Sequence, residues 1–250
     1  MIFKSQKVFN GGYVSMAETA IALKSNAQSW LPEPKKLFIG GKWVDAVSGK
    51  TFDVLDPSTG KVVAAVAAGE KEDIDLAVKA ARKAFDGEKW SGMTTSQRGL
   101  VIHKIGDLIL ENVAEFAELE SLDNGKPITI STAADVPLSA DLFHYMSGWA
   151  TKIEGNTIPI STSGIYAPGT NFLSYTLREP VGVIGQIIPW NFPLLMAAWK
   201  LGPVLATGNC VVLKPAPQTP LTAIRLAEIM QEAGLPDGVV NVVTGGDDTG

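Results

Sequence analysis

Three short segments place a group suited to chemistry directly after an apolar run. In residues 187–193, Pro189 and Pro193 fix the backbone on either side of Asn191. A rigidly held carboxamide can donate a hydrogen bond to an oxyanion, but asparagine is also a favoured helix N-cap. This segment therefore predicts either an oxyanion donor or a cap, because spacing alone does not separate the two roles.

The other two segments end in Lys214 and in Gly245-Gly246. A lysine after a buried strand can bond ribose hydroxyls or phosphate, or it can extend its ammonium into solvent. A glycine turn lets backbone approach a ligand, although this turn lacks the six-residue dinucleotide fingerprint. Lys200 interrupts an apolar helical run nine residues after Asn191 and is a further candidate for a site-facing side chain.

The elements that carry these segments alternate between strands and helices. We expect strands over residues 181–188, 210–213 and 239–243, and helices over residues 193–205 and 219–233. Alternation of this kind implies right-handed crossovers and a parallel sheet, and ligands bind beyond the carboxyl ends of such strands. The predicted fold class is therefore α/β, a Rossmann-like parallel sheet with flanking helices.

The first part of the chain predicts an antiparallel element followed by helices. Residues 37–44 have the pattern of a hairpin with Gly40-Gly41 as its turn, and residues 51–66 repeat that pattern. Apolar residues at helical spacing predict helices over residues 74–85, from residue 95, over 113–124 and over 133–150. Residues 1–34 are expected to form a flexible leader that ends in a proline-rich breaker.

Residues 155–178 differ from both flanking patterns. Two strand-like runs surround a loop rich in Ser, Gly and Pro, so we expect a β-hairpin that projects from the main domain. Exposed strand edges invite pairing, which favours a subunit contact over an ordinary surface hairpin. The last predicted strand opens into a turn at Gly250, so we expect the chain to be the front part of a longer protein.

Composition and charge argue against several function classes. The chain carries 21 Lys+Arg against 26 Asp+Glu, a net charge of −5, which argues against a nucleic-acid partner. Residues 181–199 are uncharged, but prolines and polar side chains interrupt them, so no membrane span is predicted. Because no targeting signal is evident, the expected location is cytoplasmic.

The chain has one cysteine and two histidines, and no metal site is predicted from them. Cys210 flanks an apolar run and is expected to be a buried, inert thiol. His103 and His144 lie in helical stretches, and neither shows a partner that would make a catalytic pair.

Several longer motifs carry a resemblance to a known family. They occupy residues 122–127, 179–183, 188–203 and 207–209, together with Lys214-Pro215. They resemble the NAD(P)-dependent aldehyde dehydrogenase superfamily, and within it the broad-specificity class for aliphatic and aromatic aldehydes. The resemblance implies the incomplete N-terminal half of that fold. A cofactor-binding domain would occupy residues 35–154 and 179–250, and the catalytic domain would lie outside the chain.

The resemblance also implies roles for individual residues. Asn191 would stabilise the oxyanion of a cysteine thiohemiacetal, and Lys200 would relay charge or contact the cofactor. NAD would bind along Ile187, Ile188, Pro189, Trp190, Lys214, Pro217 and Gly245, and the aldehyde tunnel would be lined by Phe192, Met196 and Trp199. The partners implied are a small aldehyde and further copies of the chain, in a dimer or tetramer joined through the 155–178 hairpin.

Three features depart from the family pattern. Pro217 stands where the family often has a glutamate that rejects a 2′-phosphate, so NADP remains possible beside NAD. Asp247 and Asp248 would repel a pyrophosphate placed close to the glycine turn. The family's cysteine nucleophile and glutamate base lie beyond Gly250, and Cys210 does not match the nucleophile's motif, so these residues alone should be inactive.

Two alternatives stay open beside oxidation of an aldehyde to its acid. Acylating members of the family release the acyl group to coenzyme A instead of water. The chain could also be a short, non-catalytic product that binds nucleotide or pairs with full-length subunits.

Overall fold

The computed structural model describes residues 21–160 and 171–250 of the chain. Its central sheet has five strands in the order β2-β1-β9-β8-β7. The parallel strands are β7 (Val183–Ile187), β8 (Cys210–Lys214) and β9 (Val240–Val242), and the antiparallel ones are β1 (Leu37–Ile39) and β2 (Lys42–Val44). β8 and β9 are buried along their whole length, which explains their unbroken apolar runs.

The sheet confirms the α/β, Rossmann-like prediction with one correction. The first hairpin, predicted as a small antiparallel element, joins the same sheet because Phe38 of β1 pairs with Val242 of β9. Its turn is as predicted, since Gly40 and Gly41 have φ of 60° and 77°, which glycine adopts without a steric penalty. The sheet is therefore mixed rather than purely parallel.

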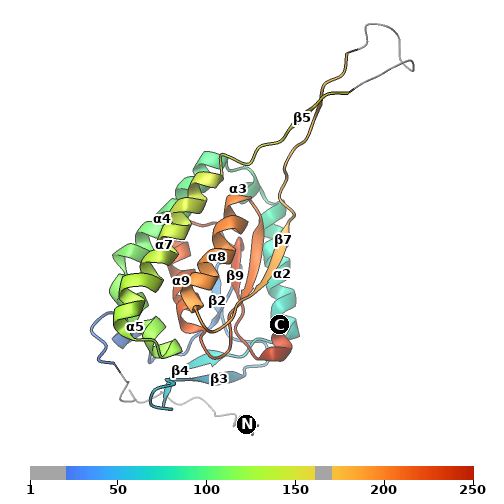
Figure 1. Ribbon diagram of the computed structural model, residues 1–250. Helices are drawn as coiled ribbons and strands as arrows, with labels where there is room; N and C mark the ends of the chain where they lie inside the picture. The colour runs from blue at the N-terminus through green and yellow to red at the C-terminus, as the bar shows by residue number, and fades with distance from the viewer. Residues whose placement is uncertain (1–20, 161–170) are drawn as a thin grey trace.

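Helices cover both faces of the sheet (Figure 1). One face carries α2 (Lys71–Asp86), and the other carries α8 (Pro193–Ala206) and α9 (Leu221–Glu232). α4 (Thr95–Glu111) and α7 (Val136–Trp149) form an outer layer, and α5 (Val113–Asn124) follows α4. The largest fully buried side chains include Trp90, Phe116, Phe143, Leu194, Leu201 and Leu205.

Short helical pieces connect the long helices. α3 (Glu88–Ser91) follows α2, while α6 (Ile128–Ile130) and a π-helical turn (Ser131–Asp135) precede α7. Pro137 lies in the first turn of α7, directly after the π-helical turn. Because proline has no N–H, it removes one hydrogen bond where the π-helical turn continues into α7.

α7 packs against α4, and this packing brings the two histidines close to Asp107. His144 Nε2 lies 2.9 Å from Asp107 Oδ1, and His103 Nε2 lies 3.8 Å from the same oxygen. No partner that would make a catalytic pair was predicted for either histidine, and the structure places both of them near the Asp107 carboxylate. The sequence did not show the partner of His144 because Asp107 lies on another helix.

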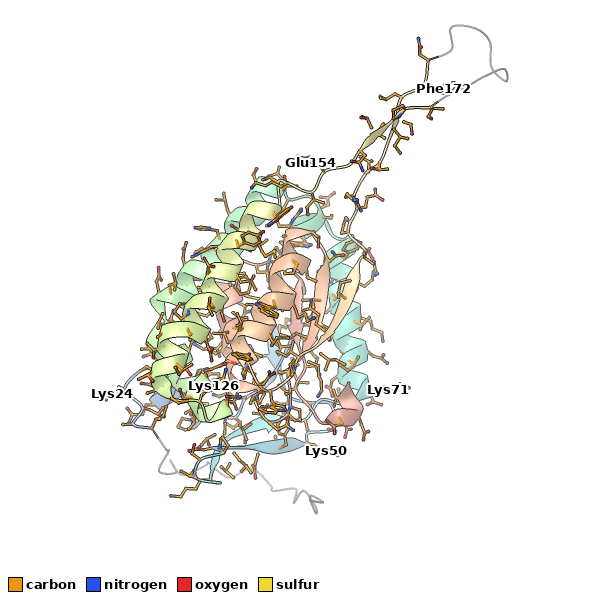
Figure 2. All side chains as sticks on the ribbon, viewed as in Figure 1. Lys24, Lys50, Lys71, Lys126, Glu154 and Phe172 are labelled. Atoms are coloured by element: carbon orange, nitrogen blue, oxygen red, sulfur yellow. The ribbon has the colours of Figure 1, made fainter. Side chains whose placement is uncertain are left out.

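Two further hairpins lie outside the sheet. β3 (Thr51–Leu55) pairs with β4 (Val62–Ala67), as the pattern predicts. β5 (Thr157–Ile158) pairs with β6 (Ser174–Tyr175) in a hairpin that projects from the helical body (Figure 1). Figure 2 labels Glu154 near its base and Phe172 in its outer part. Residues 161–170 of the predicted hairpin lie outside the described residues.

The predicted flexible leader is wrong for the part that the structure describes. α1 (Ala27–Trp30) packs on the body, and Ala27 and Leu31 are buried. The Glu118 carboxylate accepts hydrogen bonds from the backbone amides of Lys24 and Ser25 at 2.9 and 3.1 Å. Residues 21–34 are therefore folded against the body, and residues 1–20 lie outside the described residues.

The uncharged stretch from 181 to 199 is divided between β7, a turn and α8. Among the described residues, the structure contains no helix with the length and apolar character that a membrane crossing requires.

Candidate functional site

The carboxyl ends of β7 and β8 lie side by side. Their parallel register pairs Ile187 with Lys214, and the Ile188 amide donates to the Lys214 carbonyl at 3.1 Å. β9 ends next to them, because the Val243 amide donates to the Leu213 carbonyl at 2.9 Å. The structure therefore gathers the three predicted segments at one edge of the sheet, where ligands of open parallel sheets bind.

Lys214 is buried at this edge. Only 6% of the residue's surface is exposed, so its stem is buried, although the ammonium itself keeps contact with solvent. Burial lowers the pKa of the Lys214 ammonium, and the negative charge of Asp247 partly opposes that shift. Within the described part of the chain this ammonium donates no hydrogen bond. A partly desolvated ammonium without a hydrogen-bond partner favours a ligand that offers oxygen acceptors.

Asn191 lies in the turn between β7 and α8. The N-cap of α8 is Phe192, and the Asn191 side chain makes no cap hydrogen bond to that helix, so the helix-cap alternative for Asn191 is wrong. Asn191 is exposed, and its carboxamide has no hydrogen-bond partner among residues 21–160 and 171–250. Both of its N–H donors are therefore available to a ligand.

Large apolar side chains surround this turn. Ile187, Trp190, Phe192 and Trp199 are 61%, 57%, 40% and 55% exposed. Met196 is half-buried against the core, and its spacing puts it on the same face of α8 as Phe192 and Trp199. An exposed apolar patch of this kind marks a surface that binds a ligand or another part of a protein.

The glycine turn after β9 has a packing role. A short 3-10 helix, η2 (Asp247–Thr249), follows it, and Thr249 Oγ1 donates to the Gly69 carbonyl at 2.7 Å. A β-carbon at Gly245 would collide with Thr249 and with the Gly69 carbonyl. Close packing therefore explains Gly245, which is buried, while Gly246 is exposed.

The structure keeps Lys200 and Cys210 away from the Asn191 turn. Lys200 is exposed on α8, about 10 Å along the helix axis from its first residue, and forms no hydrogen bond to Asn191. Cys210 is the first residue of β8, at the opposite end of that strand from Lys214. Burial raises the pKa of the Cys210 thiol to about 12, so it is the inert thiol predicted.

Comparison with known proteins agrees with this geometry. The family model described as "Aldehyde dehydrogenase family" matches residues 43–250. The chain belongs to the aldehyde dehydrogenase family. The predicted resemblance is thereby confirmed.

Individual aldehyde dehydrogenases are similar over nearly the whole chain. The mitochondrial aldehyde dehydrogenase of Homo sapiens is 54% identical over 211 residues, which cover 84% of this chain and 39% of the relative. Aldehyde dehydrogenase family 2 member B4, mitochondrial, of Arabidopsis thaliana is 49% identical over 249 residues, which cover 98% of this chain and 45% of the relative. The NAD+ complex structure of aldehyde dehydrogenase from Bacillus cereus is 50% identical in sequence and has a TM-score of 0.85. The match covers 90% of this chain and 44% of that structure's chain. The chain thus spans less than half the length of these relatives.

In this aldehyde dehydrogenase chain, the end of α5 holds the turn that carries Asn191. Asn124 Nδ2 donates to the Trp190 carbonyl at 2.7 Å, directly before Asn191 in the chain. Glu120 Oε2 accepts from the Leu194 amide at 3.2 Å, in the first turn of α8. The turn is therefore fixed on both sides by side chains of one helix.

A third contact comes from Lys126, which lies at the opposite end of the molecule from the hairpin (Figure 2). Its ammonium is 3.7 Å from the centroid of the Phe192 ring, a cation–π contact. The same ammonium pairs with Asp135 Oδ2 at 2.6 Å and lies 3.9 Å from Glu120 Oε1. Burial raises the pKa of Glu120 to about 7, against the opposing charge of Lys126.

The role of Glu120, Asn124 and Lys126 in holding this turn was not predicted from the sequence. Residues 122–127 entered the prediction only as a family motif, independent of residues 188–193. The available signal was that both motifs belong to the same family pattern. That signal does not show contact, because Asn124 and Trp190 are 66 residues apart in the chain.

A cavity of about 510 Å³ lies elsewhere, lined by residues that include Trp30, Lys35, Arg225 and Glu228 and by none of the predicted site residues. Three of its charged groups are paired with one another, because Arg225 contacts Glu228 at 2.7 Å and Glu115 at 3.0 Å. The strand ends, with a carboxamide and an ammonium that have no hydrogen-bond partner among the described residues, are the stronger candidate site.

Proposed function

We propose that this chain forms the cofactor-binding part of an enzyme that oxidises aldehydes to carboxylic acids with NAD+. The observation that carries the proposal is the unpaired carboxamide of Asn191, held beside the strand ends where Lys214 lies. Membership of the aldehyde dehydrogenase family supports it.

The residues at the strand ends fit a dinucleotide. The Lys214 ammonium would bond ribose hydroxyls, and the exposed Ile187 and Trp190 side chains would cover apolar faces of the cofactor. The similar structure from Bacillus cereus is described as an NAD+ complex, which supports NAD+ as the first choice. NADP+ is the second choice, because Pro217 offers no carboxylate to reject a 2′-phosphate.

In the proposed reaction, a cysteine thiolate from outside these 250 residues attacks the aldehyde carbon. A C–S bond forms, and the carbonyl oxygen takes up the negative charge. Asn191 would donate an N–H to that oxygen, while Phe192, Met196 and Trp199 would hold the aldehyde's apolar part. Bound NAD+ supplies the acceptor for the hydride lost from the adduct. Water then cleaves the resulting thioester, releasing the acid and the thiol.

The decisive experiment is an assay of the full-length protein with an aliphatic and an aromatic aldehyde. We expect reduced cofactor and free carboxylic acid in equal amounts, with NAD+ and NADP+ compared in parallel. A thioester formed only when coenzyme A is present would favour the acylating alternative. Nucleotide binding without any turnover would favour the non-catalytic alternative.

Replacement of Lys214 by methionine should weaken NAD+ binding by about ten- to a hundredfold, the range expected for a hydrogen bond to a charged group. Methionine keeps the length and apolar stem of lysine, so the strand should stay intact. Titration of NAD+ into the full-length protein measures the dissociation constant. Lys79→Met, an exposed lysine on α2, is the matched control. Equal affinities of the two variants would remove Lys214 from the cofactor site.

Asn124→Ala should lower turnover by up to about tenfold, because a neutral hydrogen bond to the Trp190 carbonyl is lost. Asn124 is a positioning residue, so the effect should appear in kcat more than in the NAD+ dissociation constant. Asn124→Ser, which restores a shorter donor, should recover part of the rate. A loss of NAD+ affinity equal to the loss in kcat would contradict this assignment.

We also propose a homo-oligomer joined through the β5–β6 hairpin, and a cytoplasmic location. The exposed apolar side chains of the hairpin, such as Leu173 at 79% and Leu177 at 70%, support a subunit contact. The named relatives from Homo sapiens and Arabidopsis thaliana are mitochondrial. The relay role of Lys200 remains a prediction.

A further inference from the structure

The two histidines of the chain meet over one carboxylate on the outer helical layer. His103 and Asp107 are one turn apart on α4, and His144 reaches them from α7. Asp107 Oδ1 lies 2.9 Å from His144 Nε2 and 3.8 Å from His103 Nε2. The imidazole rings stack with centroids 4.3 Å apart. Three strong metal-ligating groups therefore converge at a place that the proposed function does not use.

Hydrogen bonding around Ser147 favours one tautomer of His103. Ser147 Oγ donates its proton to the His144 carbonyl at 2.6 Å, so it can only accept from His103 Nδ1, which lies 3.4 Å away. With the proton on Nδ1, His103 Nε2 keeps a free lone pair and lies 3.8 Å from Asp107 Oδ1. Two electron-rich atoms facing each other across 3.8 Å attract a cation between them.

The spacing of the three donors suits a small divalent ion. One ligand atom from each residue lies within 4.8 Å of the others. Ligand atoms bound tetrahedrally to zinc at 2.0–2.1 Å lie about 3.3 Å from one another. The separations from Asp107 Oδ1, 2.9 and 3.8 Å, bracket that value, and the two histidine nitrogens lie within 4.8 Å of each other, so side-chain rotations would bring the donors to zinc spacing. The side chains of His103 and Asp107 are half-exposed, which leaves room for water as a further ligand.

Gly106 makes the approach of His144 possible. A β-carbon at this position would lie 2.5 Å from Cδ2 and Nε2 of the His144 ring and 2.9 Å from the Ala140 carbonyl. The glycine between His103 and Asp107 therefore provides the space in which the third ligand lies.

We propose that His103, Asp107 and His144 bind a divalent transition-metal ion of the zinc class, which joins α4 to α7. Imidazole nitrogens with one carboxylate suit zinc, cobalt, nickel or copper, whereas calcium and magnesium prefer oxygen ligands throughout. The whole sequence holds two histidines and one cysteine, and that cysteine, Cys210, is buried. These residues therefore offer one nitrogen-rich site and no competing sulfur site.

The test is titration of the untagged protein with Co²⁺, whose visible absorption reports a site containing nitrogen ligands, followed by displacement with Zn²⁺. We expect wild type to bind one more Co²⁺ than His103→Gln or His144→Gln, with the affinity of the site at least a hundredfold weaker in either variant. Ser147→Ala, which removes only the outer partner, should weaken binding by about ten- to a hundredfold. Mg²⁺ should not displace the ion.

Asp86→Asn is the matched control, because Asp86 is an exposed helical carboxylate that contacts Arg82 four residues earlier. It should bind Co²⁺ as wild type does, and all variants should unfold like wild type without metal, because the changes are near the surface. Co²⁺ binding that is the same in wild type and both histidine variants would overturn the proposal. The cluster would then be an imidazole–carboxylate ion pair only.

Discussion

Replacing Asn191 by alanine in the full-length protein should lower kcat by about a hundred- to a thousandfold, the cost of removing one oxyanion donor. The carboxamide is exposed and unpaired within the described residues, so its donors are available for charge that develops during the reaction. The turn is fixed by Asn124 and Glu120, so the donor is already positioned before substrate arrives. Steady-state rates with saturating NAD+ and aldehyde measure the effect.

Asn191→Ala should leave folding and cofactor binding nearly unchanged. Its free energy of unfolding should stay within about 0.5 kcal/mol of wild type, as for other exposed positions. Gln28→Ala, an exposed amide on α1, is the matched control and should keep the full rate. A variant with a normal kcat would show that Asn191 does not stabilise the oxyanion, while the assignment of Lys214 to the cofactor would be unaffected.

The stability of the chain should fall as pH rises from about 4.5 to about 7, because Glu120 is buried. Its folded pKa is about 7, above its ordinary value of 4.5, mainly through desolvation. Between these values the folded state binds a proton at Glu120 that the unfolded state has released, so the free energy of unfolding decreases with rising pH. Over this window the contribution of Glu120 amounts to about 3 kcal/mol.

Glu120→Gln isolates this effect because glutamine stays neutral and can still accept from the Leu194 amide. Relative to wild type, the variant should gain about 3 kcal/mol of unfolding free energy between pH 4.5 and pH 7.5. Urea unfolding at several pH values measures that difference. Glu111→Gln, an exposed position on α4, should show no such gain. If the difference in unfolding free energy between Glu120→Gln and wild type did not change with pH, the pKa of Glu120 would not be raised in the folded state.

Asp123 should act in the same direction as Glu120. It is fully buried next to Glu120 in α5, burial raises its pKa well above the ordinary value, and its Oδ2 accepts from the Leu221 amide at 2.8 Å. Asn at this position can still accept that hydrogen bond. The polar end of α5 thus connects the two helices that follow β7 and β8.

Apolar periodicity and the positions of Gly and Pro in the sequence predicted the strands and the long helices, but not the short helices α1, α3 and α6. The Gly40-Gly41 turn, the alternation of strands and helices after residue 181, and the Pro-flanked Asn191 turn all depend on local backbone preferences. The prediction that ligand groups gather at the carboxyl edge of β7, β8 and β9 is also local in origin, because parallel strands in sequence order bring their ends together. Because these preferences are local, the family motifs could be assigned to strands, helices and turns from the sequence alone.

Tertiary packing decided which of those residues contact each other. Three contacts join segments that are far apart in the chain. Phe38 pairs with Val242 and extends the sheet, Asn124 donates to the Trp190 carbonyl, and His144 contacts Asp107. Such contacts depend on how helices and strands stack, which no local spacing specifies. Burial likewise follows from packing, since the same carboxylate would be fully hydrated on a surface helix, whereas Glu120 loses water inside the protein and changes its affinity for a proton.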